Sequence, residues 1–475
     1  MRYSVEQQAV LDSDSDALVV NAFAGAGKTS TLVGFANTRP SAKMLYVAYN
    51  RSIRDEAARK FPKSVECVTS HQLAYKTIGH RYRDKLERKL SLTLIRKELN
   101  VQSWAVAKNA FLTVKNFMSS ADPEITSAHI PITNNDRIGI KKTVSVAQLL
   151  WDRMTDPNDP LPTEHDAYLK QYELADVDLG WRYQYILFDE AQDANPVTTS
   201  IITRQESRLV LVGDRHQQIY RFRGAEDALN APELSHAQRL YLTNSYRFGP
   251  AIANVANKIL AHKKETRPVN GLSQEYGYAS EETHMGYPQA VICRTVTGVL
   301  EEALTAAQDE KTIYWVGGMK AYNIGKLCDL YRFRYEQYDR MYDPSLIEEF
   351  GTYKEFEAAA KESDDQDMNR SINVINQLGN IPALAAQCKQ STVSSIADAD
   401  VIVTTAHRSK GLEFDNVRLG SDFPDSDKLM FKPPDTVSDE LNLIYVAATR
   451  ALKTLSYSAP IGKVLKAEPG TFNAT

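Results

Sequence analysis

The sequence contains little cysteine, and this scarcity excludes two kinds of structural site. Four cysteines occur in 475 residues, and no two of them are spaced as a Cys-x-x-Cys pair. A disulfide framework or a cysteine zinc site is therefore not expected, and a reducing compartment fits the composition best. The nine histidines show no metal-ligand spacing either.

Long apolar runs and an excess of positive charge are also missing. No segment approaches the ~20 apolar residues that span a bilayer, and the first residues lack the apolar stretch of a signal peptide. Secreted and membrane proteins are thus not expected. Lys and Arg number 56 against 60 Asp and Glu, a net charge of −4, so any binding to nucleic acid must rely on local basic patches.

Short apolar runs separated by longer helical stretches predict an α/β protein. Each run has about four to seven residues, too short for a typical helix, and several are apolar at consecutive positions, as in strands buried on both faces of a parallel sheet. The spacing of Ile252, Val255, Ile259 and Leu260 is that of an amphipathic helix. Alternating strands and helices indicate parallel sheets. The predicted strands are residues 17–23, 44–48, 185–188, 209–212, 290–293, 313–316 and 401–405.

Two stretches break this alternation and are interpreted as insertions. Residues 80–180 are helix-like and begin with a strongly basic segment between Lys76 and Lys97. That segment suits binding to duplex DNA or backbone phosphate, or equally a solvated helix whose Lys and Arg stems cover apolar surface. Residues 320–390 are polar, acidic and rich in tyrosine, and their charge would repel phosphate.

A glycine-rich turn follows the first predicted strand. The segment is Gly25-Ala26-Gly27-Lys28-Thr29-Ser30, and such a turn before a helix can wrap its N–H groups around phosphates. Lys28 would reach the β- and γ-phosphates of a nucleotide, and the Thr29 hydroxyl would bind Mg²⁺. Ala22 stands where the general P-loop pattern has glycine, so an ordinary Gly/Ala turn is the alternative.

Two adjacent carboxylates end the strand predicted at 185–188. At a strand end Asp189 would lie beside the glycine-rich turn, where it can hold Mg²⁺. Glu190 would then orient or deprotonate an attacking water. A solvated turn is the alternative interpretation, but the glycine-rich turn about 160 residues upstream favours catalysis.

A third polar segment follows the strand predicted at 209–212. Gln217 suits contact with both a γ-phosphate and a neighbouring domain. Phe222 stands between Arg221 and Arg223, an arrangement that suits stacking on a base with phosphates nearby. Taken alone, an aromatic residue between arginines is more often a packed surface residue.

Together these segments resemble the motifs of superfamily 1 helicases of the UvrD/Rep type. Further matching segments follow in the expected order: Gln7 (or Gln8), Tyr49-Asn50, Thr69-Ser70-His71, Tyr246-Arg247, Thr404 to Glu413, and Glu440 to Arg450. The resemblance covers residues 1 to about 460 and is closest to the F-box DNA helicases. Ser70 and Asn442 depart from the family pattern, which usually has phenylalanine and arginine there.

The resemblance implies two RecA-like parallel-sheet domains with ATP in the cleft between them. Residues assigned to the nucleotide are Gln7, Gly25, Ala26, Gly27, Lys28, Thr29, Ser30, Tyr246, Arg247, Gly411 and Glu413. Catalytic roles fall to Lys28, Glu190, Gln217, Arg247 and Arg450, and Mg²⁺ binding to Thr29 and Asp189. Residues assigned to DNA are Asn50, His71, Phe222, Arg223, Thr405 and His407.

The resemblance also implies a function and a division of the chain. The expected activity is an ATP- and Mg²⁺-dependent DNA helicase that moves 3′→5′ and unwinds duplex in replication, recombination or repair. A DNA-stimulated ATPase that strips proteins from single strands without processive unwinding is the alternative, because it needs the same motifs. The expected partners are single-stranded DNA, its junctions with duplex, and replication or recombination proteins, with no membrane.

The expected location is the cytoplasm, either the nucleoid or a host cell, or the nucleus in a eukaryote. Residues 1–80 and 181–245 are assigned to domain 1A, 81–180 to insertion 1B, 246–318 and 392–475 to domain 2A, and 319–391 to a reduced insertion 2B. The first motif begins within ten residues of Met1, so an F-box, and with it recruitment to a ubiquitin ligase, is not expected.

Overall fold

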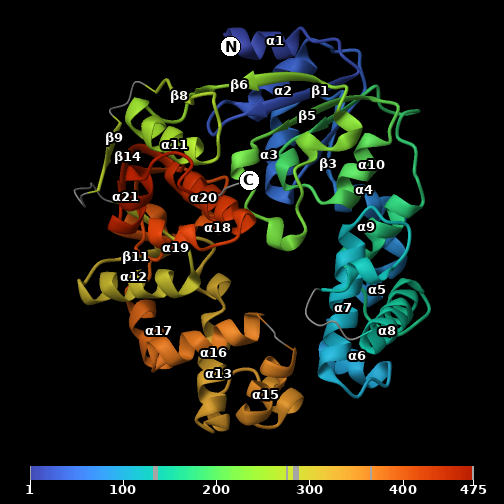
Figure 1. Cartoon of the computed structure of the whole chain (residues 1–475), viewed down its shortest axis with the longest axis vertical. Helices are drawn as coiled ribbons and strands as arrows, with labels where there is room; N and C mark the ends of the chain where they lie inside the picture. The colour runs from blue at the N-terminus through green and yellow to red at the C-terminus, as the bar shows by residue number, and fades with distance from the viewer. Residues whose placement is uncertain (1, 132–136, 274–276, 282–287, 364–365, 473–475) are drawn as a thin grey trace.

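Two six-stranded parallel sheets form the core of the protein (Figure 1). The computed structural model describes residues 2–131, 137–273, 277–281, 288–363 and 366–472. The strand order is β3-β2-β4-β5-β1-β6 in the first sheet and β11-β12-β10-β13-β14-β9 in the second. The expected α/β class with two RecA-like domains is therefore confirmed.

The first sheet is covered by helices on both faces. Its strands are β1 (Ala17–Ala22), β2 (Met44–Ala48), β3 (Val65–Thr69), β4 (Tyr185–Phe188), β5 (Arg208–Gly213) and β6 (Gln238–Leu242). Helices α2 (Lys28–Asn37) and α3 (Arg51–Lys60) contribute to the core on one face, and α4 (Ser70–Thr77) and α10 (Pro196–Thr203) to that on the other. Helix α1 (Val5–Leu11) packs against α2.

The second sheet is built in the same way. Its strands are β9 (Tyr278–Ser280), β10 (Gln289–Cys293), β11 (Ile313–Trp315), β12 (Val401–Thr405), β13 (Phe414–Leu419) and β14 (Ala451–Tyr457). One face packs on α11 (Pro250–His262), α19 (Ser426–Met430), α20 (Pro434–Ala448) and α21 (Ala459–Lys466), and the other on α12 (Val296–Gln308). The amphipathic helix expected around residues 252–260 is α11. A short pair, β7 (Asn244–Ser245) and β8 (Asn270–Gly271), follows β6, and α18 (Ala406–Ser409) follows β12.

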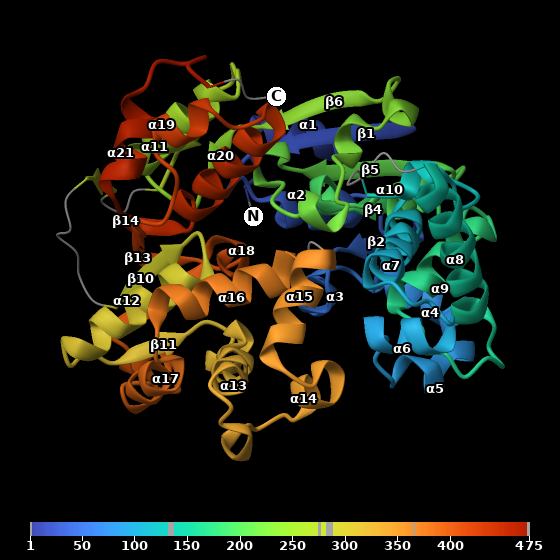
Figure 2. The same cartoon turned by 60° about the horizontal axis from the view of Figure 1, so that its bottom comes forward.

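Both predicted insertions are helical and extend from the same side of the two sheets (Figure 1). The first contains α5 (Arg83–Leu86), α6 (Leu92–Glu98), α7 (Trp104–Ser119), α8 (Arg137–Thr155) and α9 (His165–Leu174). The second contains α13 (Ile324–Arg334), α14 (Ser345–Phe350), α15 (Tyr353–Ser363), α16 (Gln366–Leu378) and α17 (Ile381–Gln390). Figure 2 shows α14 and α15 lying toward α6 and α7. Among the described helices, none has the length and apolar character needed to cross a membrane.

Candidate active site between the two sheets

The glycine-rich turn connects the end of β1 to the start of α2, as predicted. Gly25 and Gly27 adopt left-handed backbone angles, with φ of 75° and 79°. A Cβ on Gly25 would lie 2.6 Å from Arg247 Cβ, so a side chain does not fit there. Helix α2 begins at Lys28, and no described side chain caps its first turn. Its free N–H groups can therefore bind phosphate.

An oxygen-rich pair lies at the start of α2. The Thr29 hydroxyl donates to Asp189 Oδ2 at 2.8 Å, and the Tyr46 hydroxyl donates to the same oxygen at 2.8 Å. Within the described part of the chain, no cluster of three or more His, Cys, Asp or Glu could hold a metal. Hydroxyl and carboxylate oxygens nevertheless suit Mg²⁺, which commonly takes one or two protein ligands together with phosphates and water.

Glu190 lies beside this pair and faces the P-loop lysine. Its carboxylate is 3.6 Å from Lys28 Nζ and accepts a hydrogen bond from Gln192 Nε2 at 2.6 Å. The Glu190 backbone is left-handed, with φ of 54°, a strained conformation typical of functional sites. Burial would raise the pKa of Glu190, but the charges of Lys28 and Lys410 lower it to about 2, so the group is ionised.

Gln217 connects the two sheets. It follows β5 of the first sheet, and its Nε2 donates to Asp214 Oδ2 at 2.7 Å. Its Oε1 accepts from Arg450 Nη2 at 3.2 Å, and Arg450 follows α20 on the second sheet. Burial and the nearby charge of Arg247 lower the pKa of Arg450 to about 9. The structure thus brings two residues predicted from separate motifs into direct contact.

Arg247 closes the opposite wall of the cleft. Its Nε donates to Glu413 Oε1 at 2.7 Å, and its Nη1 donates to the carbonyl of Thr449 at 3.0 Å. The neighbouring Tyr246 is half exposed, and its backbone N–H donates to Gly25 O at 2.9 Å. Arg247, which was predicted to contact the γ-phosphate, is therefore paired with Glu413, which was predicted to contact the ribose.

The expected adenine-reading glutamine is turned toward the P-loop helix. Gln7 is buried, and its Nε2 donates to Thr31 Oγ1 at 3.2 Å, close to Gly27. Gln8 instead points to solvent and donates to Asp12. The geometry favours Gln7 over Gln8 as the residue near a bound base. Ser30 lies in the first turn of α2, and Gly411 has a left-handed φ of 84°.

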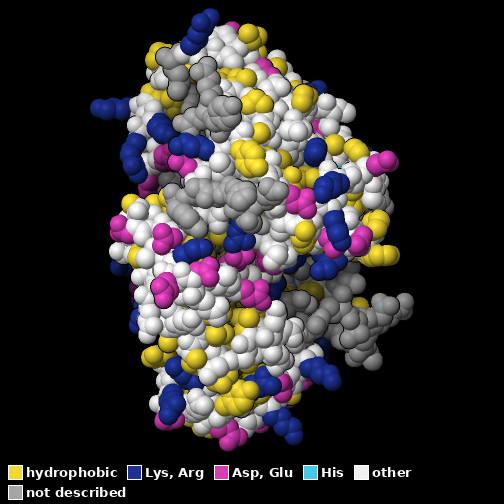
Figure 3. Space-filling view, turned by 90° about the vertical axis from the view of Figure 1, so that its left-hand side faces the viewer, with side chains coloured by type: hydrophobic (Ala, Val, Ile, Leu, Met, Phe, Trp, Pro, Cys, Tyr) yellow, Lys and Arg dark blue, Asp and Glu magenta, His cyan; other side chains and the backbone are white. Residues whose placement is uncertain are grey.

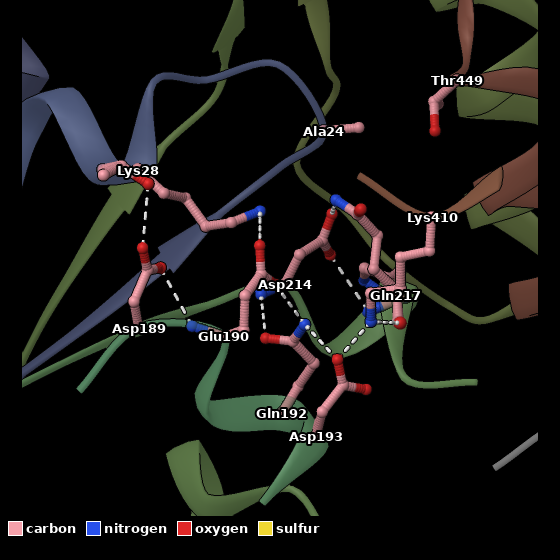
Figure 4. A network of polar contacts seen from close by, with 12 residues as sticks. Ala24, Lys28, Asp189, Glu190, Gln192, Asp193, Asp214, Gln217, Lys410 and Thr449 are labelled. Atoms are coloured by element: carbon pink, nitrogen blue, oxygen red, sulfur yellow. Dashed lines mark hydrogen bonds and ion pairs between the residues drawn. The ribbon is translucent and has the colours of Figure 1, made fainter. Parts of the chain in front are cut away.

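Lys410 is a cleft residue that the motif analysis did not single out. Its ammonium donates to the buried Asp193 carboxylate and to Gln217 O, the latter at 2.6 Å. It therefore connects α18 on the second sheet to two polar segments of the first (Figure 4). Burial raises the pKa of Asp193 to about 6, although the charge of Lys410 opposes that effect. The position of Lys410 within the Thr404 to Glu413 segment was the feature of the sequence that could have predicted its role.

Four aromatic rings from both sheets form a cluster beside the cleft, named here the aromatic cluster. Tyr49 stacks on Tyr220 with ring centroids 5.5 Å apart, and Phe222 meets His407 edge to face at 5.4 Å. The Tyr220 hydroxyl donates to the backbone carbonyl of His407 at 3.2 Å. Phe222 is 69% exposed. Exposed aromatic rings of this kind are suited to stacking on unpaired bases.

Comparison with known proteins agrees with this arrangement. Residues 42–231 match the UvrD/REP helicase N-terminal domain, and residues 323–460 match the UvrD-like helicase C-terminal domain. F-box DNA helicase protein 1 of Schizosaccharomyces pombe is 32% identical over 514 residues, 98% of this chain and 58% of that protein. F-box DNA helicase 1 of Gallus gallus is 31% identical over 504 residues, 97% of this chain and 49% of that protein.

The chain belongs to the UvrD/REP helicase family. A shorter match joins it to ATP-dependent DNA helicase PcrA of Staphylococcus epidermidis, 33% identical over 93 residues, 18% of this chain and 13% of that protein. The chain spans about half the length of the F-box DNA helicases that it matches.

Three of the other residues that the UvrD/REP resemblance assigns to DNA have structural partners. Asn50 caps α3 by accepting from Ile53 N at 2.9 Å, and Thr405 caps α18 by accepting from Arg408 N at 3.3 Å. His71 Nε2 lies 2.9 Å from Asp166 Oδ1 on α9. The side chain of Arg223 is outside the part that the structure describes. Their assignment to DNA stays a prediction.

The basic segment of the first insertion is partly used inside the protein. Lys85 is buried and donates to the carbonyls of Arg153 and Asp156 at the end of α8, at 2.8 and 2.6 Å. The guanidinium of Arg96 lies 4.0 Å above the Trp104 ring. Arg96 covers apolar surface as the alternative interpretation expects, whereas the buried Lys85 ties the segment to α8. On the outer face of the second-sheet side, basic and acidic side chains are interspersed rather than gathered by sign (Figure 3).

Proposed function

We propose that the chain is an ATP-driven motor that moves 3′→5′ along single-stranded DNA and unwinds duplex DNA. The observation that carries the proposal is the direct contact of Gln217 with Arg450 across the cleft. A nucleotide bound there would hold the two sheets together, and its hydrolysis would release them. The aromatic cluster spans the same two sheets, so their relative movement would shift any base stacked on it.

The cleft groups are arranged for phosphoryl transfer to water. The N–H groups of the turn and of α2 would bind the phosphates, and Lys28 would leave Glu190 to contact them. The freed Glu190 carboxylate would orient the attacking water and accept its proton. Arg450 would stabilise the charge that develops on the transferred phosphoryl group.

Nucleotide entry would also exchange the partners of Arg247. In the structure Arg247 and Glu413 neutralise each other at 2.7 Å. We infer that ATP separates this pair, because the Glu413 carboxylate can accept from a ribose hydroxyl while Arg247 turns to the γ-phosphate. Tyr246, fixed to Gly25 through its backbone, would then stack on the adenine.

Mg²⁺ is the metal that the oxygen pair fits. Thr29 and Asp189 would hold it, and the phosphates and water would complete its coordination. When bound, Mg²⁺ neutralises phosphate charge during transfer.

The test is steady-state ATP hydrolysis with and without single-stranded DNA. The proposal expects strong stimulation by DNA in the native chain and none in Lys28→Ala. Lys43→Ala is the matched control, because Lys43 is an exposed lysine directly before β2. If DNA does not change the rate of hydrolysis, or if RNA stimulates it more, the assignment of DNA as the substrate is wrong. If the native chain does not hydrolyse ATP, the proposal of an ATP-driven motor is wrong.

Polarity and unwinding need separate substrates. The proposal expects faster strand displacement from a 3′-tailed duplex than from a 5′-tailed one, and equal rates would contradict the direction. If the chain displaces a protein bound to single-stranded DNA but does not unwind duplex DNA, the alternative function, a translocase without processive unwinding, is supported instead. A role in replication or recombination, with the corresponding partner proteins, belongs to the same proposal.

A further inference from the structure

A closed ring of hydrogen bonds joins the P-loop to α20, and it is named here the cleft ring. The backbone N–H of Ala24 donates to the Tyr445 hydroxyl at 3.2 Å, which donates to Asp214 Oδ2 at 3.2 Å. The same Asp214 oxygen accepts from Gln217, which in turn accepts from Arg450. Tyr445 lies in the last turn of α20 and Arg450 follows the helix two residues after its end, so the main chain closes the ring.

The Tyr445 hydroxyl is fully enclosed at this junction. Tyr445 and Ala24 have no exposed surface, and Asp214 is 2% exposed. A buried donor or acceptor without a partner costs about 1–3 kcal/mol. The hydroxyl satisfies Ala24 as an acceptor and Asp214 as a donor at once. Burial raises the pKa of Tyr445 well above its ordinary value, so the donor proton is retained at neutral pH.

Aromatic packing holds the Tyr445 ring independently of its hydroxyl. The ring meets the imidazole of His216 at 6.1 Å, and that imidazole stacks on Phe23 at 6.0 Å. Tyr445 also belongs to the apolar core between α11, α20 and the second sheet. Replacing tyrosine by phenylalanine therefore preserves the packing and removes a single oxygen.

We propose that Tyr445 is a positioning residue that sets the distance between the P-loop and the arginine-bearing end of α20. The inference rests on the proposed function, ATP hydrolysis in this cleft. Because Asp214 Oδ2 is shared by Tyr445 and Gln217, the hydroxyl also fixes the carboxylate that orients Gln217. Any movement of α20 away from the P-loop breaks the bond to Ala24 or the bond to Asp214, and it moves Arg450 as well.

The test compares Tyr445→Phe with the native chain in ATP hydrolysis, and it measures kcat and KM separately. We expect the DNA-stimulated kcat to fall about tenfold or more, the scale of one lost buried hydrogen bond. The KM for ATP should change less than about twofold, because the substitution removes neither Lys28 nor any N–H group that would bind the phosphates. In a Gln217→Ala background, Tyr445→Phe should cause a smaller loss than in the native chain, because the side chain that Asp214 orients is already absent and only the bond to Ala24 remains to be lost.

Tyr322→Phe is the matched control. The Tyr322 hydroxyl is also buried and donates to the carbonyls of Val316 and Val403 at 3.1 and 3.2 Å, on the opposite face of the second sheet. A purely structural role would lower the Tm in both variants and leave kcat unchanged. Asp214→Asn tests the same ring from its other side if Tyr445→Phe is too unstable to assay, and the same kcat loss is expected.

Two outcomes are distinguishable. If the native chain shows no DNA-stimulated hydrolysis, the proposed function fails. If the native chain is active and Tyr445→Phe keeps its kcat, or raises KM alone, the positioning role is overturned and the proposed function stands.

Discussion

At the scale of single residues, Arg450 combines deep burial with four hydrogen bonds that fix its guanidinium. Its Nε donates to Val446 O at 2.9 Å, its Nη1 to Leu412 O at 3.4 Å, and its Nη2 to Gln217 Oε1 and Thr449 Oγ1. Lysine keeps the charge but cannot reproduce the planar fork. We therefore expect Arg450→Lys to lower kcat by roughly 10³-fold, the lower end of the effect of an arginine finger.

Arg418→Lys provides the control for that substitution. Arg418 forms a two-pronged pair with Glu302 on the second sheet, with donor distances of 3.1 and 2.5 Å, and has no contact with the cleft groups among those described. Steady-state kinetics should show a loss of kcat for Arg450→Lys alone. Equal kcat values for the two variants would show that Arg450 does not stabilise the transition state.

Lys263 predicts a pH dependence of stability. It is buried at the end of α11 and donates to Ser438 Oγ at 2.8 Å and Asn442 Oδ1 at 2.5 Å. Burial, assisted by the charge of Arg215, lowers its pKa to about 8. An unfolded lysine titrates near ~10.4, so between these values the unfolded state binds more protons and the free energy of unfolding rises with pH.

Lys263→Met should abolish this rise. Relative to the variant, the native chain should gain about 2–3 kcal/mol of unfolding free energy between pH 8 and about 10.5. Urea unfolding at several pH values measures the difference. Lys258→Met, on the exposed side of the same helix, should retain the native pH dependence, and an unchanged slope in Lys263→Met would refute the assignment.

At the scale of elements, the sequence predicted apolar strands better than strands of mixed polarity. The predicted strands at 44–48, 185–188 and 401–405 match β2, β4 and β12, whereas β1 and β11 end one residue earlier than predicted. The strands β3 and β6 escaped prediction because they lie at the edges of the first sheet, where polar residues alternate with apolar ones. The strands β13 and β14 were also not predicted, because their residues are of mixed polarity.

The candidate site shows the same limit. Lys28, Thr29, Asp189 and Glu190 were predictable because a turn and a strand end place them by local geometry. The pairing of Lys410 with Asp193 and the reach of Tyr445 to Ala24 depend on how two domains meet. The two residues of the first pair are 217 positions apart in the chain, and those of the second pair are 421 positions apart. No local sequence pattern predicts a contact over such separations.

The turn before α2 gives a prediction at this scale. Gly25→Ala combines a left-handed backbone with a Cβ that would lie 2.6 Å from Arg247 Cβ. We expect it to weaken ATP binding and abolish hydrolysis, because the turn must shift away from Arg247. Gly379→Ala is the control: its φ is 73°, but no atom lies within 4 Å of the added Cβ. It should lose about 1–2 kcal/mol of stability and keep its activity.

At the scale of the whole molecule, the two insertions contact each other. Trp104 on α7 stacks on Phe350 at the end of α14, with ring centroids 5.8 Å apart. Thr93 donates to Glu349 at 2.8 Å, and Ser103 donates to Glu362 at 3.3 Å. The acidic second insertion thus meets the basic first one through short polar contacts and one aromatic pair.

An aromatic pair adds about 0.5–1.5 kcal/mol beyond its buried area, so we expect the loss of one ring to weaken the contact between the insertions. We expect single-stranded DNA to pass between the two insertions on its way to the aromatic cluster. Circular single-stranded DNA has no end to thread, so on this expectation it binds only when the insertions separate. We expect Phe350→Ala to speed association with circular single strands and to leave association with short linear oligonucleotides unchanged. Stopped-flow binding measures both rates. Tyr342→Ala, which removes an 82% exposed ring from the same insertion, should behave as the native chain does. Equal rates for circular DNA in Phe350→Ala and the native chain would show that DNA reaches the cluster without passing between the insertions.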